Sequence, residues 1–64
     1  MLSQYDREHV DRILGGEGDW FTAQLLRLIA KADRSNQALL SLGFPAEVQL
    51  VRDYQAGRSV PVRP

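Results

Sequence analysis

One aromatic side chain and three basic ones recur at helical spacing in the middle of this 64-residue chain. Steps of four, three, four and three residues place five residues on one stripe: Trp20, Gln24, Arg27, Lys31 and Arg34. Cations beside an aromatic ring are typical of surfaces that contact nucleic acid or other proteins. Because three cations neutralise few phosphates, the stripe favours a protein partner, with nucleic acid as the second choice. The alternative is that the acidic N-terminal segment packs on this stripe within the fold.

Other chemically capable residues are too sparse to predict a catalytic or metal site. His9 is the only histidine, and together with Asp6 it supplies two ligands where a structural zinc ion takes four. The GGEG run at residues 15–18 precedes a predicted helix, as phosphate-binding loops do, but the lysine of a P-loop is missing. Glu17 and Asp19 would also repel a phosphate there. We therefore expect no enzymatic activity, no cofactor and no metal.

Residues 20–42 contain neither Gly nor Pro and predict one long central helix. Its apolar seam has heptad spacing and consists of Phe21, Leu25, Leu28, Ala32, Ser35, Leu39 and Leu42. A second row of Leu26, Ile29 and Leu40 widens the apolar arc to roughly 160°, which is more than one neighbouring helix covers. Ser35 could instead cap a new helix, so a break within residues 33–36 is the alternative to a continuous helix.

The wide apolar arc predicts self-association as a homodimer or higher oligomer. The candidate residues are Phe21, Leu25, Leu28, Ala32, Asn36 and Leu39. Asn36 is the polar member of this set, and one polar residue at such a seam can fix the register between helices.

Two shorter helices flank the central one. Ser3, followed by Asp6, is a candidate N-cap for a helix over residues 4–14, which the glycines from Gly15 onward end. Asp19 is the expected N-cap of the central helix. Pro45 occupies the first position of a helix over residues 45–56. The predicted fold is all-α: a three-helix assembly in one domain, residues 1–57, followed by an extended tail, residues 58–64.

Composition agrees with a small globular domain of 44% hydrophobic and 25% charged residues. Zero net charge conceals an asymmetry, because residues 1–19 carry five acids and two arginines, a net of −3. Residues 20–42 carry three bases and one acid, a net of +2. Opposite charges on successive segments favour packing within the chain. The sequence shows no signal-peptide pattern and no membrane-length apolar run, so we expect a cytoplasmic protein without a membrane partner.

The runs GDWFTAQLLRLIAKAD at residues 18–33 and GFPAEV at residues 43–48 give the chain a family resemblance. Over about residues 5–55 it resembles small proteins encoded by phages of actinobacteria. The resemblance implies a phage origin and the host cytoplasm as location. It transfers no activity and no functional residue.

These observations predict a non-enzymatic protein-binding module, a phage accessory protein that engages a host protein, self-associates, or both. One alternative is a small DNA-binding or transcription-regulatory protein that uses the two C-terminal helices and the turn between them as a helix-turn-helix. Acidic Glu47 and Asp53 on the presumed recognition helix argue against it. The other alternative is a structural or assembly protein that acts through the apolar seam.

Overall fold

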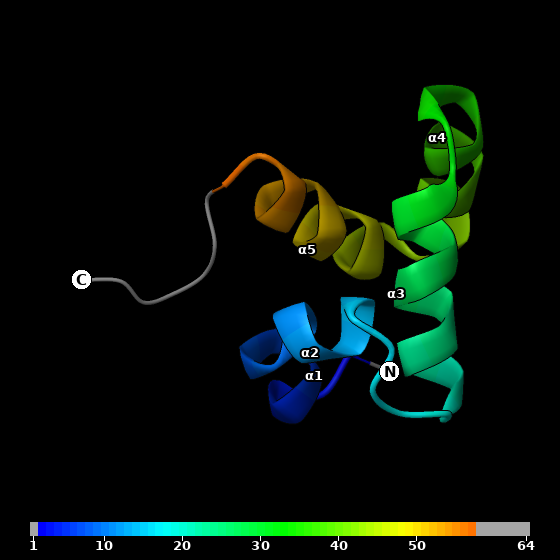
Figure 1. Cartoon of the computed structure of the whole chain (residues 1–64). Helices are drawn as coiled ribbons and strands as arrows, with labels where there is room; N and C mark the ends of the chain where they lie inside the picture. Colours follow the sequence, from blue (N-terminus) through cyan, green and yellow to red (C-terminus); the bar gives the residue numbers. More distant parts are fainter. Residues whose placement is uncertain (1, 58–64) are drawn as a thin grey trace.

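A computed structural model describes residues 2–57, which form five helices and, over that range, no strand (Figure 1). The helices are α1 (Gln4–Glu8), α2 (Val10–Leu14), α3 (Phe21–Lys31), α4 (Arg34–Gly43) and α5 (Pro45–Gln55). The predicted all-α class is confirmed. Helices α2 and α5 both pack against α3, and α4 packs mainly against α5 (Figure 1). The tail predicted at residues 58–64 lies outside the described residues.

The expectation of one continuous helix over residues 20–42 is wrong. Ala32 is extended, with φ −73° and ψ 146°, and the chain restarts as α4 after Asp33. The Asp33 carboxylate accepts the Asn36 N–H at 2.8 Å and so caps the new helix, a role the sequence had suggested for Ser35. The break persists because the cap satisfies an amide that a helix start leaves without a partner.

The predicted N-terminal helix is also divided, at His9 between α1 and α2. Its start is confirmed, because Ser3 Oγ accepts the Asp6 N–H at 3.1 Å and the Asp6 carboxylate accepts the Ser3 N–H at 3.3 Å. Its end is confirmed as well, because α2 ends at Leu14, Gly15 is the C-cap residue and the left-handed conformation falls on Gly16 at φ 118°.

The start of α3 corrects a further expectation. Trp20, not Asp19, is the N-cap residue of α3, and no side chain caps the helix there. Asp19 contributes its backbone instead, since its carbonyl accepts the Gln24 side-chain amide at 2.7 Å. Gly18 is left-handed at φ 95°, and a Cβ atom on it would collide with the Trp20 ring. The fold therefore requires glycine at position 18.

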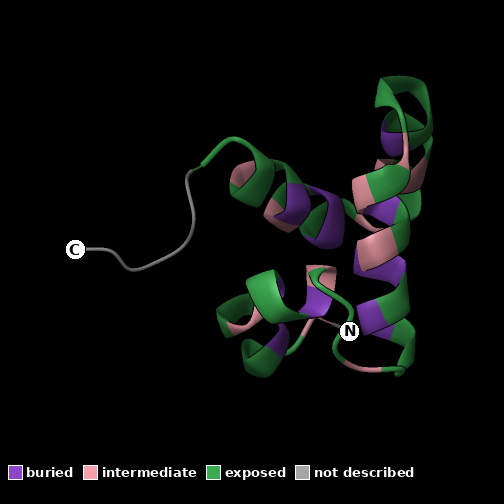
Figure 2. Cartoon of the chain, in the orientation of Figure 1, coloured by how far each residue is buried: buried purple, intermediate pink, exposed green. Residues whose placement is uncertain are grey.

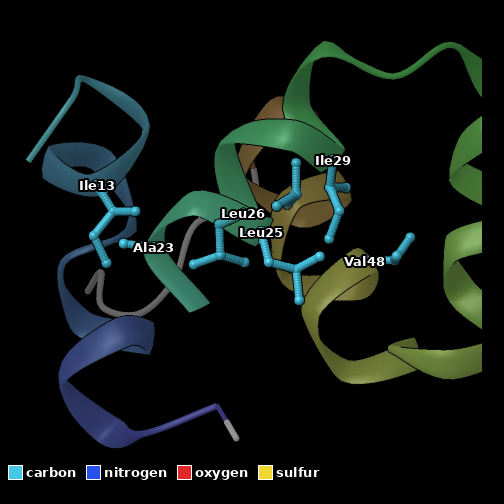
Figure 3. Close-up of a cluster of buried hydrophobic side chains, with 7 residues drawn as sticks. Ile13, Ala23, Leu25, Leu26, Ile29 and Val48 are labelled. Atoms are coloured by element: carbon cyan, nitrogen blue, oxygen red, sulfur yellow. The ribbon is translucent and has the colours of Figure 1, made fainter. Parts of the chain in front are cut away.

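The hydrophobic core lies between α2, α3 and α5 (Figures 2 and 3). Its buried members are Ile13, Ala23, Leu25, Leu26, Ile29, Val48 and Val51. Helix α4 adds no buried apolar side chain, and its one buried residue is Gln37. Gln37 donates its amide to the Ile29 carbonyl at 2.9 Å. A polar contact at the end of α3 therefore helps to hold α4, whose leucines stay largely outside the core.

We predict that Asp33→Ala lowers the free energy of unfolding by about 1 kcal/mol, because it removes the cap of α4. Ser35→Ala is the matched control and should leave stability nearly unchanged, since Asp33 makes the capping bond. Urea denaturation followed by circular dichroism measures both. Equal losses in the two variants would contradict the cap assignment.

Candidate functional site

Trp20, the head of the predicted basic stripe, is tied to the N-terminal helices. Its indole Nε1 donates to the Asp6 carboxylate at 3.1 Å, and Tyr5 meets its ring edge-on with centroids 5.9 Å apart. Asp6 is buried and also accepts the Ser3 hydroxyl at 3.0 Å. This arrangement satisfies a buried carboxylate and joins α1 to the start of α3.

Arg27, the centre of the stripe, has an intramolecular role. Its half-buried guanidinium donates to three backbone carbonyls: Ile13 at 2.8 Å, Glu17 at 3.0 Å and Gly18 at 2.6 Å. These bonds hold the end of α2 and the following glycine loop, residues 15–18, against α3. The acidic N-terminal segment therefore packs over this part of the stripe, largely through backbone oxygens.

The remaining stripe residues do not form one continuous surface. Gln24 is exposed and bonded to the Asp19 carbonyl. Lys31 and Arg34 are exposed as well, but the break between α3 and α4 separates them, so they share no helix face. Of the five residues predicted to bind a partner, Lys31 and Arg34 are the two whose cationic groups the fold leaves at the surface.

The residues predicted to self-associate are divided between core and surface. Leu25 is buried in the core, so it is not available to a partner. Phe21 is the first residue of α3, and the other four gather around the corner where α3 turns into α4. Leu28, Ala32, Asn36 and Leu39 line a groove of about 490 Å³ between the two helices, together with Lys31 and Leu40. We call this the apolar groove.

Large apolar side chains stand exposed beside the apolar groove. Phe21 and Leu28 on α3 are 63% and 54% exposed, and Leu39 and Leu42 on α4 are 65% and 82% exposed. We call these four residues the apolar face. The Phe21 ring lies 6.1 Å from that of Phe44, which follows α4, so the far ends of α3 and α4 also meet. The sequence placed Leu42 on the apolar seam but not among the candidate contacts.

A second, polar cleft of about 650 Å³ lies between α4 and α5 and was not foreseen. Much of its lining is already hydrogen-bonded. Arg52 Nε donates to the Gln37 side-chain oxygen Oε1 at 3.3 Å, and the Gln49 side-chain amide donates to the Asp53 carboxylate at 2.9 Å. The Gln55 side-chain amide donates to the Ala30 backbone carbonyl of α3 at 3.3 Å. Through these bonds the polar cleft joins α5 to α3 and α4. No periodic pattern in the sequence predicted these contacts.

His9 and Asp6, the two metal ligands considered from the sequence, lie within residues 2–57. No three His, Asp or Glu side chains of this range come together as metal ligands would. His9 stacks on Tyr5 with ring centroids 4.0 Å apart, and its Nδ1 lies 3.0 Å from the Tyr5 carbonyl oxygen. No helix in the described range has the length and apolar character needed to cross a membrane.

Tyr5 is hydrogen-bonded to Glu17, and this contact changes the pKa of the Tyr5 hydroxyl. The Tyr5 hydroxyl donates to the Glu17 carboxylate at 2.8 Å. This hydrogen bond, helped by partial burial and by the negative charge of Glu17, raises the pKa of Tyr5 above its ordinary value of 10.0. The nearby Arg12 acts in the opposite direction.

We predict that Arg27→Ala lowers the free energy of unfolding by about 2–3 kcal/mol, because it removes a charged donor from three carbonyls. Lys31→Ala on the same helix is the control and should change stability little, since Lys31 is exposed. Urea denaturation measures both variants. If Arg27→Ala were as harmless as Lys31→Ala, the guanidinium would not hold the loop.

We predict that Tyr5 ionises above pH 10 in the folded protein and that Glu17→Gln lowers its pKa, because the amide carries no charge. The folded pKa is raised above the unfolded value. The bond therefore stabilises the fold fully below pH 10, and this contribution is lost as pH rises through the folded pKa. NMR titration of the Tyr5 ring in a Tyr54→Phe background gives the value. A pKa unmoved by Glu17→Gln would count against the hydrogen bond.

Comparisons with known proteins assign no function to this geometry. No protein-family model, curated protein or solved structure matches the chain. The functional proposal therefore rests on the surfaces themselves, and of these the apolar face and its groove are the strongest candidate site.

Proposed function

We propose that the protein is a non-enzymatic protein-binding module whose binding surface is the apolar face of α3 and α4. The observation that carries the proposal is the exposure of Phe21, Leu28, Leu39 and Leu42, each more than half accessible, beside an apolar groove. Single exposed apolar residues are common on soluble proteins. Several that adjoin a groove are typical of a protein contact site.

Helix α4 supports the proposal through the way it is held. Its cap at Asp33 and its buried Gln37 are polar anchors, and none of its leucines is buried in the core. Leu39 and Leu42 are three residues apart and so lie beside each other on the helix surface. A helix anchored on one side by polar contacts, with leucines on another, is suited to present those leucines to a partner.

One exposed cation fits the edge of such a site. Lys31 lines the apolar groove, whereas Arg34, at the first position of α4, lines the polar cleft between α4 and α5. Protein interfaces typically combine an apolar centre with a polar, solvent-accessible rim. Lys31 therefore keeps a place in partner binding, whereas Trp20, Gln24 and Arg27 position the helices.

The biological setting of the proposal comes from the resemblance to proteins of actinobacterial phages. In that setting the module is a phage accessory protein in the host cytoplasm. Its partner is a host protein, another copy of the chain, or both.

The DNA-binding alternative receives less support from the geometry. A single residue, Phe44, connects α4 to α5, whereas a helix-turn-helix uses a turn of three or four residues. Glu47, one of the two acids predicted on the recognition helix, is buried. Arg52 on the same helix donates to Gln37 within the polar cleft.

We predict that a photoreactive phenylalanine analogue at position 39 forms adducts with protein when the chain is expressed in an actinobacterial cell. Leu39 is 65% exposed on the proposed surface, so a bound partner lies within reach of the label. The matched control carries the same analogue at Gln55, an exposed position on α5 outside the apolar face. Gel electrophoresis and mass spectrometry identify the adducts, with and without nuclease.

Protein adducts at position 39 that are absent at position 55 are the expected result. Adding Leu28→Glu should reduce them, because it places a charge in the apolar groove. Adducts that disappear with nuclease would favour the DNA-binding alternative. Equal labelling at both positions, or none at either, would contradict the proposed binding surface.

A further inference from the structure

We propose that the apolar face binds a second copy of this chain, with the two α3 helices antiparallel across a two-fold axis. The inference rests on the proposed function, because it names the occupant of that same surface. Three features of the molecule carry it: the size of the face, the small core and the charges at the two ends of α3.

The apolar face would supply the centre of an interface of standard size. Such an interface buries about 800 Å² on each partner, which is about a fifth of the 4187 Å² accessible surface of the chain. Four apolar side chains, each more than half exposed on α3 or α4, would form its centre, and the polar residues around them would form its rim.

The small core favours a second copy over an occasional partner. Chains shorter than about 70–80 residues rarely gain enough stability from one core, and they commonly rely on disulfides, metals or association. This chain has no cysteine, so no disulfide adds to its stability. Burial of Phe21, Leu28, Leu39 and Leu42 against their own copies would extend the core whenever the chain is present. A host protein would do so only in the complex.

The charges distinguish the two possible directions of packing. The four residues of the apolar face carry no charge. Lys31 lies at the end where α3 turns into α4 and lines the apolar groove, and exposed Asp19 lies just before the opposite end of α3. Arg34 and Asp33 are at the same end as Lys31, but Arg34 lines the polar cleft and the Asp33 carboxylate caps α4. Parallel packing would bring Lys31 next to its own copy, which is unfavourable.

Antiparallel packing resolves this conflict. Asp19 lies just before α3 and Lys31 is the last residue of α3, so a helix about 15 Å long lies between them. Reversing one α3 over the other therefore brings Asp19 of one protomer towards Lys31 of its partner. A two-fold interface repeats each contact, and the pair therefore forms twice. The uncharged face lies between the two pairs.

Sedimentation equilibrium of the purified full chain tests the association. We expect a dimer for the wild type and at least about a tenfold weaker association for Leu28→Glu and for Leu39→Glu, since each would bury an unpaired charge. Both positions are exposed, and circular dichroism will verify that the variants keep their helices. Tyr54→Glu is the matched control: it introduces the same charge at an exposed aromatic residue of α5 and should remain dimeric.

Disulfide trapping tests the direction. Because the chain has no cysteine, single variants Asp19→Cys and Lys31→Cys each carry a unique thiol. Mixing the two under mild oxidation should yield the crosslinked 19–31 pair in excess over 19–19 and 31–31. An excess of 31–31 crosslinks would overturn the antiparallel arrangement in favour of the parallel one.

The outcomes also separate this inference from the proposed function. A folded wild-type monomer at all concentrations overturns the second copy. If the label at position 39 then still forms adducts with another protein, the binding module stands without self-association. A dimer that survives both Leu28→Glu and Leu39→Glu would place the contact elsewhere and overturn the use of this face.

Discussion

The turn at Ala32 and Asp33 is the constraint on which the proposed binding surface depends. An extended residue followed by a capped helix start ends α3 and redirects the chain, so that α4 does not continue the axis of α3. The Asp33 cap and the bond from Gln37 to the Ile29 carbonyl then hold α4 in place. As a result, the apolar seam is bent into a groove at the corner of two helices. A straight helix would have presented it as a stripe.

Polar contacts perform much of the positioning in this small fold. Arg27 joins three carbonyls of α2 and the glycine loop to α3, and buried Asp6 joins the N-terminal cap to Trp20. Each of these contacts satisfies groups that would otherwise be costly to bury. These contacts do not pair opposite charges, because Arg27 binds backbone carbonyls and Asp6 accepts from the neutral Trp20 indole. This is also why an apparently basic stripe is a weak guide to the binding surface.

The small size of the core also explains why large apolar side chains remain at the surface. Helices α2, α3 and α5 supply the buried apolar cluster, while α4 keeps its leucines at the periphery. Exposed leucine and phenylalanine side chains gain little in an isolated chain, since water remains in contact with them. In the proposed complex they would become the apolar centre of an interface, with Lys31 at its rim. On that proposal, apolar residues on one side of α3 serve folding and those on another side serve association.

The sequence by itself determined the local features. The Ser3 cap, Pro45 at the start of α5, the all-α class and the apolar phase of α3 all follow from short-range rules of helix geometry and capping. It did not determine the break at Ala32, because no Gly or Pro marks it and the apolar phase continues on both sides.

Only the tertiary structure decided which part of the wide apolar arc is buried. Leu25 enters the core and Leu28 does not, although both belong to one seam. Periodicity gives the direction of a side chain around its helix, but the elements that cover that direction come from distant parts of the chain. The use of Arg27 was hidden for the same reason. Its carbonyl partners lie nine to fourteen residues away, in a loop whose path depends on left-handed Gly16 and Gly18.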